Sequence, residues 1–205
     1  MNTRNTALIT GILALVISCA AGYFWFDRPL TEFFATYRGS GLYLTFKQVT
    51  RLGESQWYLI AGLLAWIILK KRAPQQAASG MLLFSSVAAS GIAANLFKSL
   101  LGRARPRLYF HDGIYGFDFF HIEYAWLSFP SGHSATALSA ASALAIMFPR
   151  FRVPLYLTGI FVASSRIILT EHYLSDVLAG SALGVATTFI LYHHYFQPQL
   201  HEPAT

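Results

Sequence analysis

The chain has 205 residues, of which 55% are hydrophobic and only 12% are charged. Soluble domains carry about 25% charged residues, so this composition excludes an ordinary soluble protein and indicates a membrane protein. The formal net charge of +6 is typical of basic loops and an anionic ligand, and no basic-aromatic motif points to nucleic acid as a partner.

The first predicted transmembrane helix covers residues 7–26, which contain no charged side chain and are long enough to cross a bilayer. A secretory or lipoprotein signal is the alternative, because Arg4 precedes the run and Cys19 lies within it. The apolar run continues to Phe26, beyond a usual signal core, which favours an uncleaved helix. Cys19 is also the single cysteine, which excludes an internal disulfide and a multi-cysteine metal site.

Residues 27–56 mix aromatic and charged side chains, which predicts one or two amphipathic segments in the membrane interface. A short second span is predicted over residues 57–69, with polar residues at both ends that reach toward the headgroups. Four more spans are predicted at residues 79–101, 134–148, 153–170 and 176–196. Between and after them lie a polar-aromatic loop (109–129), a tight connection (171–175) and a polar tail (197–205).

The sequence therefore predicts an all-α polytopic membrane protein, with one domain over residues 1–205, six transmembrane helices and interfacial amphipathic segments. Six alternating spans place both termini on one side of the membrane. The ends of the third and fifth spans and the starts of the fourth and sixth then face the other side. Dense basic loops at residues 70–72 and 150–152 favour cytoplasmic termini, although most Lys and Arg lie on the opposite side. The expected location is the cell (inner) membrane, with that opposite side toward the periplasm or exterior.

Six ionisable side chains lie at the helix ends of this opposite side: Lys98, Arg105, His133, Arg166, His172 and Asp176. Charged groups at membrane depth are costly and usually mark a functional site. Two histidines and one carboxylate are also typical of a metal site, but three cations beside them favour a multiply charged anion. The guanidinium groups of Arg105 and Arg166 can each donate two parallel hydrogen bonds to phosphate oxygens. Lys98 adds a compact positive charge.

Residues 128–135 predict the start of the fourth span, where Pro130 and Gly132 form a turn and serines serve as N-caps. Unpaired amides and the positive end of the helix dipole favour an anion at this point. The backbone from Ser131 to His133 is therefore expected to form an oxyanion cradle.

The two histidines differ in their neighbours. His172 precedes Asp176 by one helical turn, so the carboxylate can accept from one ring nitrogen and leave the other for nucleophilic attack. An ordinary helical ion pair is the alternative for these two residues. His133 has no such partner in the sequence and faces the expected phosphate, which favours a general acid for the leaving oxygen.

Three motifs follow in order: Lys98 with Arg105-Pro106, then Pro130-Ser131-Gly132-His133, then Ser165-Arg166 with His172 and Asp176. In these motifs the chain resembles the type 2 phosphatidic acid phosphatases, membrane relatives of vanadium haloperoxidases. The resemblance implies a haloperoxidase-like helical core and a metal-independent phosphohydrolase that uses no cofactor. It further implies that His172 forms a phosphohistidine oriented by Asp176 and that His133 protonates the leaving oxygen. The residues expected to hold the phosphoryl oxygens are Lys98, Arg105, Ser131, Gly132 and Arg166.

The resemblance also implies a lipid phosphate as substrate, because family members act on phosphatidic acid, phosphatidylglycerophosphate, undecaprenyl diphosphate or lipid A. Lipid-to-lipid phosphotransfer at the same site is one alternative. An anion transporter is another, disfavoured because permeation requires no histidine nucleophile. Polar residues near the loop after the third span are candidates for substrate selection, with a solvated loop as the alternative: Arg103, Arg107, His111, Asp112, Asp118, His121 and Glu123. The sequence leaves the oligomeric state open.

Overall fold

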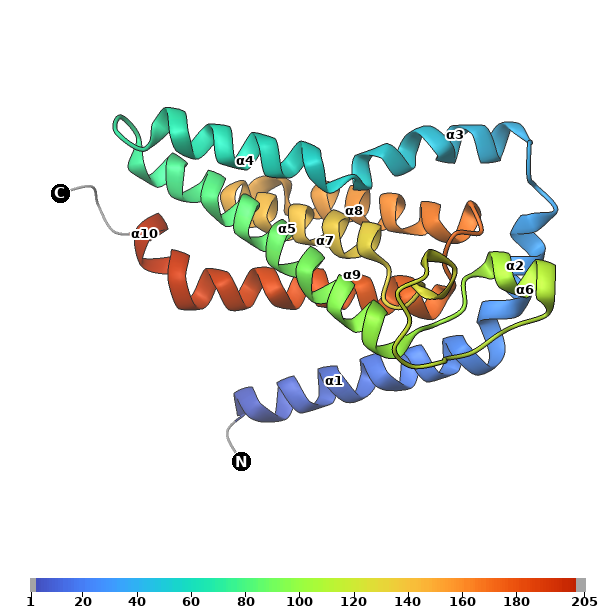
Figure 1. Ribbon diagram of the computed structural model, residues 1–205. Helices are drawn as coiled ribbons and strands as arrows, with labels where there is room; N and C mark the ends of the chain where they lie inside the picture. The colour runs from blue at the N-terminus through green and yellow to red at the C-terminus, as the bar shows by residue number, and fades with distance from the viewer. Residues whose placement is uncertain (1–2, 202–205) are drawn as a thin grey trace.

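The computed structural model describes residues 3–201, which form a bundle of long helices that run side by side (Figure 1). The bundle consists of α1 (Thr3–Ala21), α4 (Ser55–Leu69), α5 (Pro74–Leu101), α7 (Gly132–Met147), α8 (Arg152–Ile168) and α9 (Leu174–Leu191). Within residues 3–201 no β-strand forms, and two isolated bridges pair Arg103 with Phe117 and Leu127. The predicted all-α class is confirmed.

Shorter helical segments connect or extend the long helices. In the first half of the chain they are η1 (Gly22–Phe26), α2 (Asp27–Ala35), α3 (Gly41–Val49) and η2 (Thr50–Gly53). In the second half they are α6 (Pro106–Asp112), η3 (Tyr124–Trp126), η4 (Pro149–Phe151), η5 (Tyr192–Phe196) and α10 (Gln197–His201). The predicted polar tail therefore begins as a short helix, and its residues 202–205 lie outside the described part of the chain.

The long helices alternate in direction, so α1 begins and α9 ends at the same end of the bundle (Figure 1). At the opposite end, the C-terminal ends of α5 and α8 meet the N-terminal ends of α7 and α9. This arrangement matches the alternation predicted from the sequence, and it places the motif residues at one end of the molecule.

Five helical runs of the described chain are long and apolar enough to cross a membrane: Leu8–Ala35, Gly41–Leu69, Pro74–Leu101, Pro149–Ile168 and Leu174–Leu200. The predicted count of six is not confirmed, because α7, with 16 residues, is not among these runs. α7 packs against α5, α8 and α9, and its buried residues are mainly alanine and serine. Its sequence therefore suits close helix packing inside the protein rather than contact with lipid.

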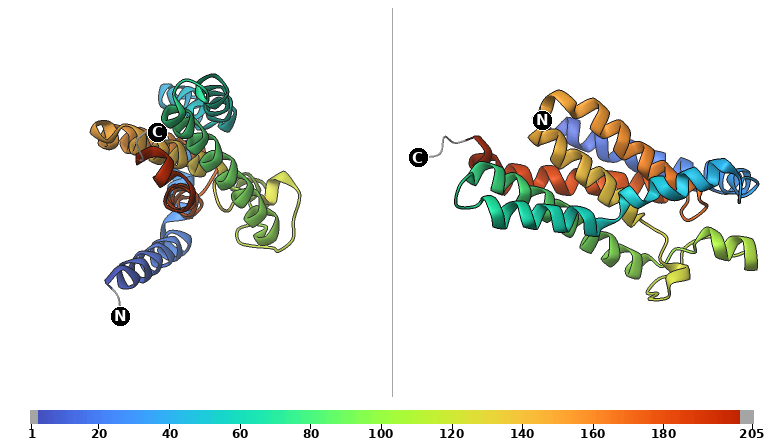
Figure 2. Two further views of the ribbon diagram at one scale, coloured as in Figure 1. Left: turned by 90° about the vertical axis from the view of Figure 1, so that its left-hand side faces the viewer. Right: turned by 90° about the horizontal axis from the view of Figure 1, so that it is seen from above.

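The region predicted as interfacial, residues 27–56, divides between two helical runs. α3 and η2 lead directly into α4, so the second run begins at Gly41 and is longer than the predicted span. α2 follows α1 through the π-helical segment η1 and crosses the end of the bundle (Figures 1 and 2). The end-on view in Figure 2 also shows α1 at the margin of the bundle, where it packs on α9.

Two glycines of α9 allow this helix to approach the backbone of α7. A Cβ at Gly180 would lie 2.3 Å from the carbonyl oxygen of Ser131, and a Cβ at Gly184 would lie 2.3 Å from that of Ala135. Small residues spaced by four permit such close packing of membrane helices. The start of α7, which carries the second motif, is therefore held directly against α9, which carries Asp176.

Replacement of Gly180 by alanine is expected to lower thermal stability, because the added Cβ forces α7 and α9 apart. Overpacking of this kind costs about 1–3 kcal/mol. Gly11→Ala in α1 is the matched control, since a Cβ at Gly11 meets nothing within 4 Å and alanine favours helix. The unfolding temperature in detergent should fall for Gly180→Ala alone, and equal values for the two variants would contradict the close contact.

Candidate active site

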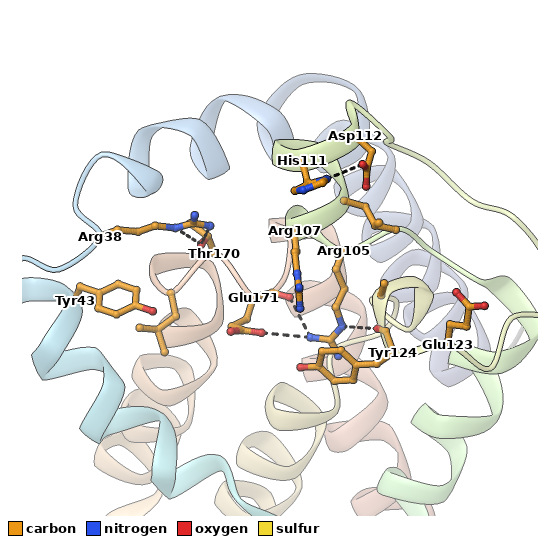
Figure 3. A pocket seen from close by; sticks show the side chains of 13 residues that line it. Arg38, Tyr43, Arg105, Arg107, His111, Asp112, Glu123, Tyr124, Thr170 and Glu171 are labelled. Carbon is orange, nitrogen blue, oxygen red and sulfur yellow. Dashed lines mark hydrogen bonds and ion pairs between the residues drawn. The ribbon is translucent and has the colours of Figure 1, made fainter.

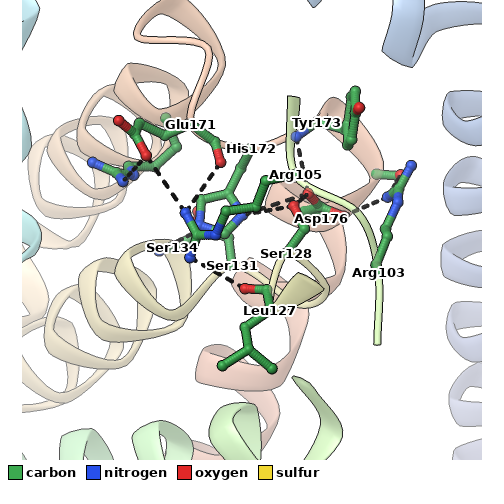
Figure 4. A network of polar contacts seen from close by, with 12 residues as sticks. Arg103, Arg105, Leu127, Ser128, Ser131, Ser134, Glu171, His172, Tyr173 and Asp176 are labelled. Carbon is green, nitrogen blue, oxygen red and sulfur yellow. Dashed lines mark hydrogen bonds and ion pairs between the residues drawn. The ribbon is translucent and has the colours of Figure 1, made fainter. Parts of the chain in front are cut away.

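A cavity of about 590 Å³ lies at the end of the bundle where the three motifs meet. Six of the eight predicted site residues line it: Lys98, Arg105, Gly132, His133, Arg166 and His172. The other two, Ser131 and Asp176, are fully buried and do not line the cavity. The structure therefore brings the predicted constellation together, with Asp176 buried behind the cavity lining. Figure 4 shows Asp176 next to His172.

The first motif occupies the end of α5 and the turn that follows it. Lys98 lies in the last turn of α5, and Gly102 ends the helix in a left-handed conformation with φ of 54°. A Cβ at Gly102 would lie 1.6 Å from the carbonyl oxygen of Asp118, so glycine is required for this turn. Pro106 then opens α6 directly after Arg105. The turn returns the chain so that Arg105 reaches the same cavity as Lys98.

The guanidinium group of Arg105 is held by backbone carbonyl groups. Its Nε donates to the carbonyl of Tyr124 at 3.1 Å, and its Nη2 donates to that of Leu127 at 3.1 Å. Its Nη1 donates to the carbonyl of Glu171 at 3.3 Å, and the group stacks 3.9 Å from the centre of the Tyr124 ring. Because these contacts fix the plane of the guanidinium, the N–H donors of Arg105 are already oriented before an anion binds.

Arg166 organises the connection between α8 and α9. Its carbonyl oxygen accepts hydrogen bonds from the amides of Glu171 and His172, at 3.0 and 3.1 Å. Its Nη1 donates to the hydroxyl of Thr50 at 2.8 Å, which ties the third motif to η2. The short connection therefore places His172 beside the guanidinium that belongs to the same motif.

The imidazole of His172 is only 2% exposed and is oriented through its Nδ1 atom. Nδ1 lies 3.4 Å from Oδ2 of Asp176 and 3.4 Å from the hydroxyl oxygen of Ser128. Burial, followed by the positive charges of Arg105, Lys98 and Arg166, lowers the pKa of His172 well below the usual value. A lowered pKa extends the neutral form to more acidic pH, so a nitrogen lone pair is available at neutral pH.

The second motif forms the first turn of α7. Ser131 caps the helix, since its hydroxyl accepts from the amide of Ser134 at 3.4 Å. The amide of Ser131 itself donates to the carbonyl of Asp176 at 2.9 Å, so it is already used inside the protein. Of the three backbone amides expected to bind an oxyanion, those of Gly132 and His133 are therefore the remaining candidates. A Cβ at Gly132 would lie 3.8 Å from Nζ of Lys98, which places this helix start beside a cation.

A family model described as the PAP2 superfamily matches residues 79–199, which is more than half of the chain and includes all eight site residues. The chain belongs to the PAP2 superfamily.

Two curated relatives are lipid A 1-phosphatases of Rhizobium species. The protein of Rhizobium etli is 39% identical over 149 residues, a match that covers 66% of this PAP2 chain and 64% of the relative. The protein of Rhizobium johnstonii is 39% identical over 149 residues, with coverage of 66% and 61%. The matched region therefore spans less than two thirds of the length of these relatives.

Two solved structures share the fold of this PAP2 protein. LpxE of Aquifex aeolicus superposes with a TM-score of 0.63 at 20% identity, covering 83% of this chain and 97% of that one. A PAP2-type phosphatidylglycerolphosphate phosphatase of Bacillus subtilis superposes with a TM-score of 0.68 at 21% identity, covering 90% and 94%. With the five apolar runs, these membrane relatives identify the chain as an integral membrane protein.

A buried ion network lies behind His172 in this PAP2 protein. Arg103 is fully buried, and its guanidinium donates through Nη1 to Oδ1 of Asp176. Its Nη2 lies 2.6 Å from Oδ2 of Asp27, at the start of α2. Asp27 also accepts from the amide of Ser175 at 2.9 Å, at the start of α9. The chain around Asp27 thereby stabilises the helix that carries Asp176.

The sequence prediction missed this network. It placed Arg103 among the substrate-selecting loop residues, which is wrong because Arg103 has no exposed surface. It also placed Asp27 in an interfacial segment, whereas its side chain is fully buried. One signal was available: an aspartate directly after a long apolar run needs a buried partner, and Arg103 lies two residues from Arg105.

The other loop candidates separate into two groups. Arg107, His111, Asp112 and Glu123 line a second cavity, which has a volume of about 760 Å³. Asp118 and His121 instead pair with each other, with Oδ2 and Nε2 at 2.7 Å. The first group therefore lines a cavity, whereas Asp118 and His121 line neither of the two cavities described.

Replacement of Arg103 by glutamine is expected to lower stability strongly, because two buried carboxylates lose their shared cation. Removal of one partner from a buried ion pair costs about 3–5 kcal/mol. Arg107→Gln is the control, since Arg107 is an exposed arginine of the same segment. Thermal unfolding in detergent should show a large loss for Arg103→Gln only. Similar unfolding temperatures for both variants would contradict the structural role of the network.

Proposed function

We propose that this PAP2 protein is a metal-independent membrane lipid phosphatase that works through a phosphohistidine. One observation carries the proposal: a buried, neutral His172, held at Nδ1 by Asp176, lines the same cavity as Lys98, Arg105 and Arg166. The three cations supply the charge that a phosphoryl group needs, in place of a metal ion. The similarity to lipid A 1-phosphatases supports the same activity.

The proposed reaction has two steps that share the two histidines. In the first, Nε2 of His172 forms a bond to phosphorus, while the bond from phosphorus to the lipid oxygen breaks and the imidazolium form of His133 gives that oxygen its proton. Burial and the three cations lower the pKa of His133, and the negative charge of the bound phosphate offsets these cations. In the second, His133 takes a proton from water, whose oxygen attacks phosphorus and releases His172 and inorganic phosphate. Asp176 stabilises the positive charge that develops on His172. Lys98, Arg105, Arg166 and the Gly132 amide stabilise the charge on the phosphoryl oxygens.

The lining of the cavity supports an amphiphilic substrate. Beside the cations, the cavity is bordered by Leu59 of α4 and by Val87 and Ile92 of α5. A phosphate held by the cations would therefore have apolar surface next to it for the lipid part. The relatives favour a lipid A type phosphate, with phosphatidylglycerophosphate, phosphatidic acid and undecaprenyl diphosphate as the further candidates. Transfer of the phosphoryl group to a lipid hydroxyl instead of water is the alternative reaction.

The function is tested by phosphate release from these four lipid phosphates with purified protein in EDTA. We expect release from at least one lipid in the presence of the chelator, and none for His172→Ala. Labelled phosphoryl groups that appear on an added lipid acceptor rather than as free phosphate would favour the transferase. Activity that EDTA abolishes and one divalent metal restores would contradict the proposed mechanism.

The roles of the two histidines are separated with leaving groups of different basicity. A lipid monophosphate leaves as a basic alkoxide and needs a proton, whereas p-nitrophenyl phosphate leaves as a weakly basic anion. General acid catalysis contributes roughly 10²–10⁴-fold. His133→Ala should therefore lose much more kcat/KM on the lipid monophosphate than on the aryl phosphate, whereas His172→Ala should be inactive on both. Equal proportional losses for His133→Ala, with chemistry rate-limiting, would leave His133 only a phosphate-binding role.

We further propose that the site faces the periplasm or exterior of the cell membrane, as the basic loops at residues 70–72 and 150–152 favour. In a Cys19→Ser background, an impermeant thiol reagent on intact cells with a permeabilised outer membrane should label Ile114→Cys. It should not label Gln76→Cys at the other end of the bundle. Ile114 and Gln76 are both exposed, so either result reports topology. Labelling of Gln76→Cys alone would reverse the orientation.

A further inference from the structure

A second cavity of about 760 Å³ adjoins the candidate active site (Figure 3). Arg105 and Tyr124 line both cavities, so the stacked pair forms part of the wall between them. Glu171 lines the second cavity and precedes His172 in the chain. Its side chain is 42% exposed, in contrast to the fully buried carboxylate of Asp176. Glu171 is therefore an accessible carboxylate beside the candidate nucleophile.

The carboxylate of Glu171 contacts two of the three cations that the proposed mechanism assigns to phosphate. Its Oε2 lies 3.4 Å from Nη1 of Arg105 and 3.7 Å from Nη2 of Arg166. Figures 3 and 4 show this side chain pointing toward Arg105. Neither arginine depends on this carboxylate for its position, because backbone carbonyls hold Arg105 and Thr50 bonds Arg166. Glu171 therefore adds negative charge next to the two arginines, together with one long hydrogen bond from Nη1 of Arg105 at 3.4 Å.

The charges in the site indicate what this contact does. Lys98, Arg105 and Arg166 provide three positive charges, and Glu171 offsets one of them. The remaining excess of two matches a phosphate monoester, which carries a charge of about −1.5 to −2 at pH 7. Without Glu171, inorganic phosphate would meet three uncompensated cations in a site where burial strengthens electrostatic attraction. Such a site would hold its product tightly.

We propose that Glu171 is a resident counter-anion that tunes the affinity of the site for phosphate and so speeds product release. The inference rests on the proposed phosphatase function and concerns the same cavity. The Glu171 carboxylate shares Arg105 and Arg166 with the phosphoryl group, which weakens the binding of every phosphate species by a similar amount. Glu171 makes no bond to the reacting atoms, so it is not a catalytic residue and acts on phosphate affinity through Arg105 and Arg166.

The test compares Glu171→Gln with Glu32→Gln, which removes an exposed carboxylate that lines neither of the two cavities. The measured quantity is the inhibition constant of inorganic phosphate during turnover of p-nitrophenyl phosphate. We expect phosphate to inhibit Glu171→Gln about tenfold more strongly than wild type, as loss of one nearby charge predicts. The KM and kcat of Glu171→Gln should both fall, because substrate and product are both retained. Glu32→Gln should remain within about twofold of wild type.

The expected change is a gain in phosphate affinity, which distinguishes the proposed role from a loss of structure. A variant that merely loses its structure would bind phosphate more weakly, so a gain in affinity cannot arise from misfolding. Unchanged or weaker inhibition of Glu171→Gln by phosphate, with an active wild type, would overturn the counter-anion role and leave the phosphatase function standing. A wild-type protein that neither hydrolyses phosphate esters nor binds phosphate would instead overturn the proposed function, and the inference with it.

Discussion

The carboxylate of Asp176 has no exposed surface, and the candidate site depends on the contacts that stabilise its charge. Oδ1 accepts from Arg103, while Oδ2 accepts from the Ser128 hydroxyl at 2.6 Å and from the Tyr173 amide at 2.9 Å. These donors come from the turn after α5, the loop before α7 and the start of α9. A buried carboxylate without such partners would lose much of its solvation energy without compensation. The polar network therefore connects three segments and holds Asp176 in contact with His172.

The charged side chains around His172 lie in two layers, an inner ion network and an outer group of cations that line the cavity. On the inner side, Arg103 lies between Asp27 and Asp176, so its charge is used entirely within the protein. On the cavity side, Lys98 and the two outer arginines remain available to a ligand. This separation explains why a chain with several buried cations still has a cavity that attracts anions. It also explains why His172 can be oriented by a carboxylate and remain neutral, since cations and burial both disfavour its protonation.

Sequence reasoning succeeded where the relation between residues is local or carried by a motif. The spacing of His172 and Asp176 predicted their contact, and the helix boundaries near α5, α7 and α9 were predicted to within a few residues. It failed where partners are distant: Asp27 and Arg103 are 76 residues apart, and only the path of α1 and α2 across the bundle brings them together. The predicted count of six membrane spans is not confirmed, because α7 is not among the five long apolar runs. α7 is a short apolar helix of 16 residues whose alanines and serines are buried by three neighbouring helices.

The short connection between α8 and α9 joins Arg166, one of the cations that line the cavity, to His172 through a backbone hydrogen bond. The carbonyl of Arg166 accepts the amides of both Glu171 and His172, so a shift of this connection would move an anion fork and the proposed nucleophile together. Within the same turn, Thr170 has a φ of 54°, which a β-branched residue adopts only when its surroundings enforce it. Arg38 bonds the Thr170 hydroxyl at 2.8 Å and so connects the turn to the segment after α2. Because α2 begins with Asp27, one N-terminal segment contacts the site at two places: the buried ion network through Asp27 and the turn between α8 and α9 through Arg38.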